Sequence, residues 1–269
     1  CGAGHQAEVT WRGGGDIPIV AAMMTYRRFL GAAAALSMLA TPVLGGGWGA
    51  KLSRPIVVEL YTSEGCSSCP PADELLAQLS QRNDVIALTL PVTYWDMLGW
   101  KDTLASDANT RRQKGYAEAM RSGGVYTPQA VIDGIDDIVG SKDSAIAADL
   151  AAREADMESV PVSLSATPKE IRVVIGPGHA GSDATVWLFH VLAKATVTIN
   201  AGENAGQTLT YRNVVRDVRA VGLWKGQQVV LDLPRADMAS PPSDAIAVIV
   251  QEGGYGRIVG AAMLTKPEY

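Results

Sequence analysis

Cysteine and histidine are scarce in this sequence, with three of each among 269 residues. Two cysteines, Cys66 and Cys69, lie three positions apart, and the third is at position 1. A structural zinc site takes four cysteine or histidine ligands, and neither a second cysteine pair nor a neighbouring histidine pair completes one. His179 and His190 are isolated. We therefore expect no metal, and since no phosphate-binding loop stands out we expect no organic cofactor.

Basic residues are also fewer than acidic residues. The chain has 23 lysine and arginine residues against 28 acidic residues, a formal net charge of −5. Residues 1–45 carry three arginines and two acidic residues, so the remainder is close to −6. Nucleic acids and anionic membrane surfaces attract basic proteins, so this balance argues against both as partners.

Long apolar runs are missing, apart from one short run near the start. Residues 29–39 are uncharged and almost wholly apolar, Arg27 and Arg28 precede them, and three glycines follow at 45–47. This pattern is typical of a secretory signal peptide, and the run is too short to span a bilayer. A buried N-terminal helix is the less favoured alternative. We expect residues 1–45 to be removed, leaving a periplasmic or secreted protein without stable membrane insertion.

Residues 46–158 alternate between strand and helix patterns. The expected order is a strand at 56–61, a helix after Pro70, a strand at 85–92, an aromatic segment at 94–102, a helix at 107–121, short strands at 129–132 and near 138, and a last helix after 141. Asp107 is expected to cap the second helix. Arg111, Arg112 and Arg121 are expected on its solvated face.

Residues 159–269 contain no convincing helix pattern. Short alternating runs separated by turn residues lie near 162–166, 171–175, 185–199, 208–221, 228–233, 245–251 and 258–264. Strands at this spacing favour an antiparallel sandwich or barrel-like subdomain. The sequence therefore predicts an α/β domain at 46–158 followed by an all-β subdomain at 159–269.

The Cys66–Cys69 pair follows the first predicted strand directly. A C-x-x-C at a strand-to-helix junction is typical of a thiol–disulfide redox site, where thiolate is the nucleophile. If the helix begins at Cys66 or Ser67, its unpaired N–H groups lower the pKa of the Cys66 thiol. Cys66 is then the attacking thiol and Cys69 the resolving thiol.

A second motif lies about sixty residues later, where Thr127 and Pro128 precede a short apolar strand that ends in Asp-Gly. The two motifs together resemble thioredoxin-like proteins. That resemblance implies a cis Thr127–Pro128 bond lying against Cys66, with the backbone of Thr127 open to a substrate strand.

The resemblance extends to a narrower family. Residues 57–73, 94–102, 202–206, 209–211 and 213–216 are similar to a family of bacterial secreted proteins catalogued as domain of unknown function 1223. The similarity covers nearly the whole chain after the signal. It implies a thioredoxin-like fold with an additional all-β subdomain, and it brings no substrate with it.

Glu59 is the one charged residue of the first predicted strand. Thioredoxins carry a buried acid near this place, so the resemblance suggests that Glu59 accepts a proton from Cys69. The strand-to-cysteine loop is one residue longer here, which makes the correspondence inexact. A solvent-facing glutamate is the alternative.

The sequence thus predicts an exported thiol–disulfide oxidoreductase that acts on protein thiols or disulfides. Cys66, Cys69, Thr127, Pro128 and Glu59 are its candidate catalytic residues. Two alternatives stay open: a non-enzymatic binding or adaptor module with a passive disulfide, and delivery of Cu(I) by the dithiol. The redox direction and the oligomeric state are not predicted.

Overall fold

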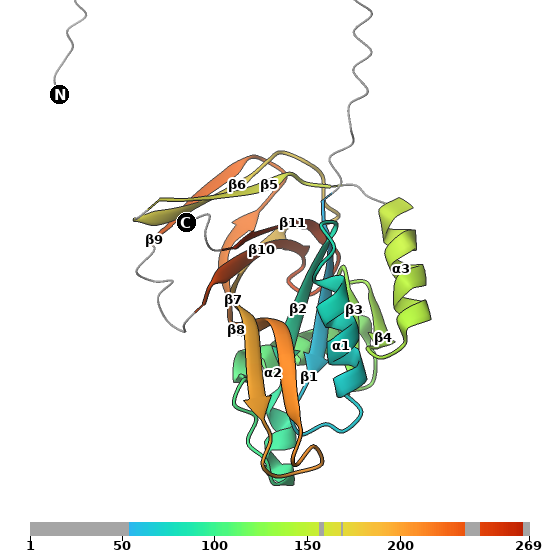
Figure 1. Cartoon of the computed structure of the whole chain (residues 1–269). Coiled ribbons are helices and arrows are strands. Elements are labelled where there is room, and N and C mark those ends of the chain that lie inside the picture. The colour runs from blue at the N-terminus through green and yellow to red at the C-terminus, as the bar shows by residue number, and fades with distance from the viewer. Residues whose placement is uncertain (1–53, 156–158, 168, 235–242, 266–269) are drawn as a thin grey trace, which may run out of the picture. The chain divides into compact units, whose positions relative to one another are not determined.

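The computed structural model describes residues 54–155, 159–167, 169–234 and 243–265, and the predicted signal lies outside these ranges (Figure 1). The described chain is a mixed α/β structure with one large mixed sheet and few helices. Its helices are α1 (Pro70–Leu79), the 3-10 helix η1 (Thr93–Leu98), α2 (Asp107–Met120) and α3 (Asp143–Ala155). Its strands are β1 (Ile56–Thr62), β2 (Val85–Pro91), β3 (Gln129–Ile132), β4 (Asp136–Val139), β5 (Val162–Ala166), β6 (Glu170–Ile175), β7 (Ala184–Thr198), β8 (Thr208–Trp224), β9 (Val229–Pro234), β10 (Ala245–Glu252) and β11 (Ile258–Thr265).

The large sheet has the strand order β11-β10-β7-β8-β2-β1-β3-β4. Strand β1 pairs in parallel with β2 and antiparallel with β3, which pairs antiparallel with β4. Every residue of β1 and β2 is buried, as expected for strands covered on both faces. The predicted strands and helices of residues 56–155 are confirmed within a few residues.

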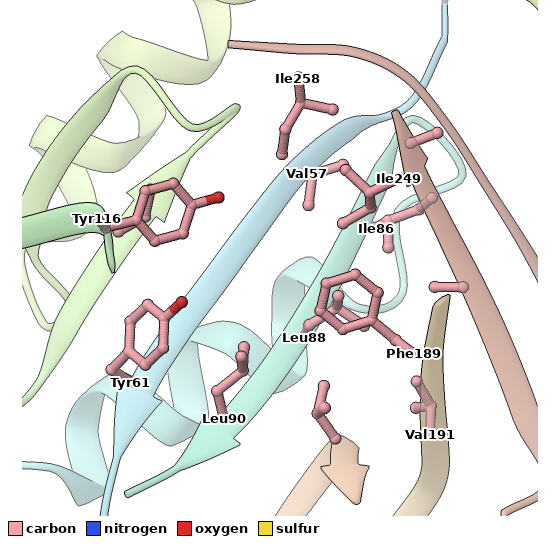
Figure 2. Close-up of a cluster of buried hydrophobic side chains, with 14 of the residues drawn as sticks. Val57, Tyr61, Ile86, Leu88, Leu90, Tyr116, Phe189, Val191, Ile249 and Ile258 are labelled. Atoms are coloured by element: carbon pink, nitrogen blue, oxygen red, sulfur yellow. The ribbon is translucent and has the colours of Figure 1, made fainter. Parts of the chain in front are cut away.

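The alternation of side chains along β1 divides the core into two layers. Val58 and Leu60 pack with α1 and α3, against residues such as Leu76 and Ile146. Val57 and Tyr61 point to the opposite face. There they join a cluster with Tyr116 of α2 and with apolar side chains of β2, β7 and β10, drawn in Figure 2.

Only some of the strands after residue 159 form a separate sheet. Strands β7, β8, β10 and β11 extend the sheet that β1 to β4 begin, while β5, β6 and β9 form a separate three-stranded sheet. The smaller sheet packs on β7, β10 and β11 through a second apolar core. The antiparallel strands predicted here are confirmed. The sequence pattern changes near residue 159, but the large sheet contains strands from both sides of that residue.

The junction of the two sequence halves lies between β2 and β8. Thr89 pairs with Val214, and its hydroxyl donates a hydrogen bond to the carbonyl oxygen of Arg212 at 2.6 Å. Asn213 has a positive φ of 49°, a conformation that asparagine tolerates better than most residues. Its side-chain amide donates to the Ala87 carbonyl oxygen at 2.9 Å, so side chains supplement a short backbone ladder.

The helix start considered for Cys66 is not observed, and Asp107, the predicted cap of the second helix, is instead its first residue. Helix α1 begins at Pro70 rather than at Cys66 or Ser67, and Cys69 is its N-cap. The chain first makes two turns, closed by backbone bonds from Cys66 N to Ser63 O and from Cys69 N to Cys66 O, both 3.1 Å. Helix α2 is capped by the Ser106 hydroxyl, which accepts a hydrogen bond from Asn109 N.

Glu59 and Arg112 form an ion pair inside the protein. Arg112 donates to the two Glu59 carboxylate oxygens at 2.5 and 2.9 Å, and the two side chains are 2% and 0% exposed. The guanidinium also lies 5.0–6.0 Å from the ring centres of Tyr116, Trp187, Phe189 and Tyr255. The prediction that Arg112 lies on a solvated helix face is wrong, because an acid and four aromatic rings enclose it.

Replacing Arg112 with Met should lower the free energy of unfolding by about 3–5 kcal/mol, because Glu59 would stay buried without its cation. The matched control is Arg111→Met on the exposed face of the same helix, with an expected change below about 0.5 kcal/mol. Urea unfolding measures both. Equal losses in the two variants would contradict a stabilising role for the pair.

Candidate functional site

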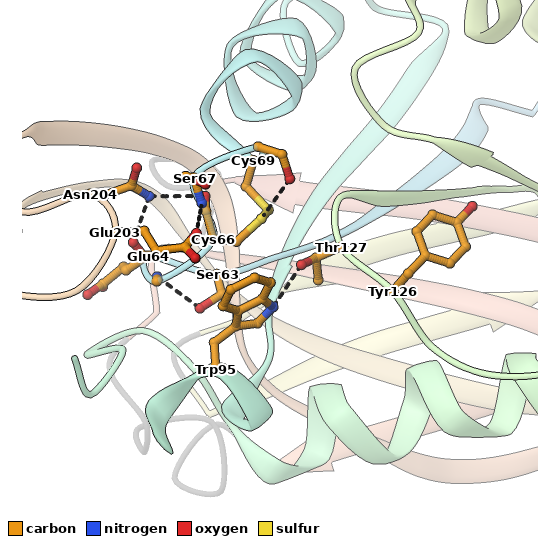
Figure 3. Close-up of a disulfide and its surroundings, with 12 residues drawn as sticks. Ser63, Glu64, Cys66, Ser67, Cys69, Trp95, Tyr126, Thr127, Glu203 and Asn204 are labelled. Carbon is orange, nitrogen blue, oxygen red and sulfur yellow. Dashed lines mark hydrogen bonds between the residues drawn. A yellow bond between two sulfur atoms is a disulfide. The ribbon is translucent and has the colours of Figure 1, made fainter. Parts of the chain in front are cut away.

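Cys66 and Cys69 form a disulfide between the end of β1 and the start of α1 (Figure 3). Both residues have 0% exposed surface in this state. The Ser68 hydroxyl oxygen lies 3.4 Å from Cys66 Sγ. The arrangement is a closed disulfide at a strand-to-helix junction, with its sulfur atoms away from solvent.

The start of α1 offers no free N–H group to a sulfur atom. Pro70 and Pro71, the first two helical residues, have no backbone N–H. The next two donors, Ala72 N and Asp73 N, both bind the Cys69 carbonyl oxygen, at 2.8 and 3.1 Å. The predicted stabilisation of a Cys66 thiolate by the helix start is therefore not supplied by this geometry.

Trp95 connects the disulfide loop with the proline motif. Its indole N–H donates to the Thr127 hydroxyl at 2.8 Å, and a Cβ added to Gly65 would lie 3.3 Å from Trp95 Cβ. The Thr127–Pro128 bond is cis, as the resemblance implied. Figure 3 shows the disulfide and Thr127 on segments that face each other, with Trp95 below them.

A loop distant in sequence binds the backbone next to the disulfide. Residues 199–207 connect β7 with β8, and Asn204 Nδ2 donates to the carbonyl oxygens of Glu64 and Cys66 at 2.9 and 3.0 Å. Glu203 Oε2 accepts a hydrogen bond from Ser67 N at 3.1 Å. Sequence reasoning missed both residues. The similarity of residues 202–206 to the bacterial family was their only signal, and it carried no indication of this position.

Glu59 does not lie with Cys69. Its side chain is on the face of β1 that α2 covers, whereas α1, which Cys69 caps, packs on the other face. Both carboxylate oxygens accept hydrogen bonds, from Arg112 and from the Tyr116 hydroxyl. The structure gives Glu59 a place in the core and not in proton transfer with Cys69, and the solvent-facing alternative is also wrong.

The acid that accompanies Cys69 is Asp73, which sequence reasoning also missed. It lies one helical turn after Cys69 on the buried face of α1, and it is 6% exposed. Burial raises its pKa well above the usual value, and the nearby Asp102 acts in the same direction. The Thr62 hydroxyl faces the carboxyl, yet among the described residues neither carboxyl oxygen has a hydrogen-bond partner.

Asp73 also borders a cavity of about 550 Å³ beside α1 and β8. The cavity is lined by Pro70, Pro71, Asp73, Glu74, Ala77 and residues 208–210 and 212. Since Glu74 and Thr208 are exposed, the cavity reaches the surface. Asp73 lines this cavity, although neither of its carboxyl oxygens has exposed surface.

Two more buried acids, Glu64 and Asp102, support the loop before Cys66. Glu64 accepts hydrogen bonds from Trp100 Nε1 at 2.5 Å and from the Thr103 hydroxyl at 2.8 Å. Asp102 accepts from Glu64 N and from Leu104 N, both at 2.8 Å. The aromatic segment predicted at 94–102 is thus fastened to the disulfide loop by its acids and tryptophans.

Residues 57–251 match the family described as "Protein of unknown function (DUF1223)". The chain belongs to this family. It is similar to a crystal structure of a protein from Agrobacterium tumefaciens, with 38% identity and a TM-score of 0.72 over 82% of this chain and 98% of that one. HBP35 of Porphyromonas gingivalis has a similar fold at 13% identity, with a TM-score of 0.54 over 79% of this chain and 75% of that one. No curated protein matches.

Across the described ranges, no three histidine, cysteine or acidic side chains are grouped as metal ligands. In the same ranges no helix has the length and apolar content needed to cross a bilayer.

Asp102 should make the stability of the protein depend on pH. Burial and the nearby Glu64 carboxylate raise its pKa from an ordinary 3.8 to about 7. Between these values the folded state holds a proton that the unfolded state releases. The free energy of unfolding should therefore fall as pH rises from about 4 to about 7, and then level off.

Asp102→Asn should flatten that part of the profile, and the exposed Glu118→Gln should leave it unchanged. Urea unfolding at a series of pH values measures all three proteins. A slope that persists in Asp102→Asn would show that another group is responsible.

Proposed function

We propose that this chain is a thioredoxin-like thiol–disulfide oxidoreductase that acts on the thiols or disulfides of other proteins. The observation that carries the proposal is the Cys66–Cys69 disulfide, formed at a strand-to-helix junction and linked through Trp95 to the cis Thr127–Pro128 segment. The strand order β2-β1-β3-β4, with α1 and α2 in the crossings, supports the thioredoxin-like part. The predicted signal places the reaction in the periplasm or outside the cell, without nucleic acid or membrane insertion.

The exchange has two steps. A substrate thiolate attacks Cys66 Sγ, the bond between the two cysteine sulfurs breaks, and Cys69 leaves as a thiolate that takes up a proton. The second thiolate of the substrate then attacks the substrate sulfur that is bonded to Cys66. A substrate disulfide forms and Cys66 is released as a thiolate. Two electrons pass from the substrate dithiol to the protein, so the substrate is oxidised, and the reverse sequence reduces a substrate disulfide.

Asp73 is the proposed proton donor and acceptor for Cys69. Its raised pKa keeps the carboxyl protonated over a wider pH range than usual, so it has a proton for the departing Cys69 thiolate. Because both carboxyl oxygens are buried, the return of a proton from the cavity beside α1 requires a local opening that admits water. In the reverse direction the ionised carboxyl removes the Cys69 proton.

Cys69→Ala should accumulate mixed disulfides between Cys66 and partner proteins, because no resolving thiol remains to release them. Non-reducing electrophoresis and mass spectrometry of cells expressing the variant detect these species. The double variant Cys66→Ala/Cys69→Ala is the control and should trap none. The proposal fails if Cys69→Ala traps no partner and the purified wild type neither oxidises nor reduces a model peptide.

Asp73→Asn should slow formation of the mixed disulfide between a substrate dithiol and Cys66 by about a hundredfold, because the carboxyl no longer supplies a proton to the departing Cys69 thiolate. Rapid-quench kinetics with a two-cysteine peptide, at several pH values, measure this step. Glu74→Gln, a change at the exposed neighbour of Asp73, should leave the rate unchanged. Glu59→Gln should lower the free energy of unfolding and leave the rate close to that of the wild type. A wild-type rate and pH profile in Asp73→Asn would remove Asp73 from the reaction.

One observation favours a second candidate, a binding or adaptor module with a passive disulfide. Both sulfur atoms are buried, and exchange requires access to one of them. A reduction potential well below about −300 mV would favour this candidate, since structural disulfides lie in that range.

A further inference from the structure

The chain's own loop between β7 and β8 binds the backbone of the disulfide loop. Exchange requires a thiolate to approach a disulfide sulfur directly, and neither cysteine has exposed surface. Residues 199–207 reach the disulfide through Asn204 and Glu203, which bind the backbone of residues 64–67. Exchange at the site therefore needs the packing around the sulfur atoms to open, and residues 199–207 are one of the segments that hold the disulfide loop in place.

The contacts of the loop are few and specific. Asn204 is 1% exposed, and its amide donates both of its hydrogen bonds to carbonyl oxygens of the disulfide segment. Glu203 is exposed, and its hydrogen bond with Ser67 lowers the pKa of its carboxyl, so the charged form favours the closed loop. Gly202 has a φ of +78°, and an added Cβ would lie 3.1 Å from Trp100 Cβ.

The loop is also closed on itself. Backbone hydrogen bonds join Ile199 N to Gln207 O at 2.9 Å and Gly206 N to Ile199 O at 2.7 Å. A side-chain pair, Thr198 with Thr208, closes the base at 3.0 Å. Because these bonds lie within the hairpin, the loop can leave the disulfide without losing them.

We propose that residues 199–207 are a displaceable cap on the Cys66–Cys69 disulfide, and that the group which takes their place is a polypeptide segment of the substrate protein. This inference rests on the proposed exchange function and specifies its substrate. The cap satisfies one backbone N–H and two carbonyl oxygens of residues 64–67. An incoming polypeptide carries both carbonyl acceptors and N–H donors for them, whereas a small thiol without amides does not.

The energetic consequence is selectivity. A reagent that reacts only with the open form has its rate reduced by the fraction of open molecules. A polypeptide that binds residues 64–67 offsets the opening with its own contacts and is slowed less. The cap therefore protects the disulfide from small thiols more than from protein substrates.

The first test measures reduction of the purified disulfide by dithiothreitol and by a water-soluble phosphine, with alkylation and mass spectrometry as readout. Asn204→Ala removes two hydrogen bonds and should speed both reactions by roughly tenfold. Asn200→Ala is the matched control, since Asn200 is an exposed residue of the same loop, and it should leave both rates unchanged. Equal rates in wild type and Asn204→Ala would overturn the cap.

Glu203 provides a graded series. Glu203→Ala should speed reduction by about threefold to tenfold, and Glu203→Gln, which keeps an acceptor oxygen, should fall between it and wild type. Amide hydrogen exchange separates opening from general loosening. In Asn204→Ala, faster exchange should be confined to residues 63–69 and 199–207, and faster exchange throughout the sheet would contradict a local cap.

The second test addresses the substrate. A peptide with two cysteines in about ten residues should reduce wild type faster than dithiothreitol at equal thiolate concentration, and this preference should shrink in Asn204→Ala. A preference that is the same in both proteins, or absent from wild type, would overturn the polypeptide assignment. Phosphine reduction needs no biological substrate, so the cap can be verified even if Cys69→Ala traps no partner and the proposed exchange function fails.

Discussion

The structure depends on the buried pair of Glu59 and Arg112. Glu59 belongs to β1, Arg112 to α2, and the amide oxygen of Gln251, at the end of β10, accepts a further hydrogen bond from the guanidinium at 3.0 Å. Two charges taken out of water stabilise a fold only when their remaining hydrogen-bonding groups also find partners. Tyr116 and Gln251 supply most of them, Arg112 Nη1 has no hydrogen-bond partner among the described residues, and four aromatic rings lie against the guanidinium. The pair thus fixes α2 on the sheet at the place where early and late strands of the chain meet.

This arrangement brings the β7–β8 loop to the disulfide. A Cβ on Gly115 would lie 2.4 Å from the Tyr255 ring, so only glycine lets α2 approach the turn after β10 so closely. With α2, β7 and β10 held together, β8 pairs with β2, and the loop that opens β8 lies beside the disulfide loop (Figure 1). Strands that the sequence suggested as a separate subdomain therefore complete the candidate site. The dithiol and its cover come from sequence positions about 140 residues apart.

Local sequence patterns predicted the features that local interactions determine, namely the secondary structure and the two motifs. The strands, the helices and the two motifs follow from periodicity, prolines and resemblance, and the structure confirms their positions and the cis bond at Thr127–Pro128. The roles of Glu59, Asp73 and Asn204 depend on which face of β1 meets α1 and on which loop reaches the disulfide. Strand alternation places Glu59 on the same face as Val57 and Tyr61, but the helix that covers that face is decided by tertiary packing. The sequence around a charged residue in a strand, or a polar residue in a helix, does not indicate which helix or loop will pack against it.

The charges around the disulfide affect the stability of its reduced form relative to its oxidised form. A reactive thiolate is normally stabilised by nearby cations or by free N–H groups at a helix start. Here the first two helical residues are prolines, and the next two N–H groups already bind the Cys69 carbonyl oxygen. The side chains that support the disulfide loop include Glu64, Asp102 and Glu203, and like charges disfavour a thiolate. Strongly oxidising disulfides are those whose reduced form is stabilised. Since this environment gives a thiolate little such stabilisation, it favours the disulfide form.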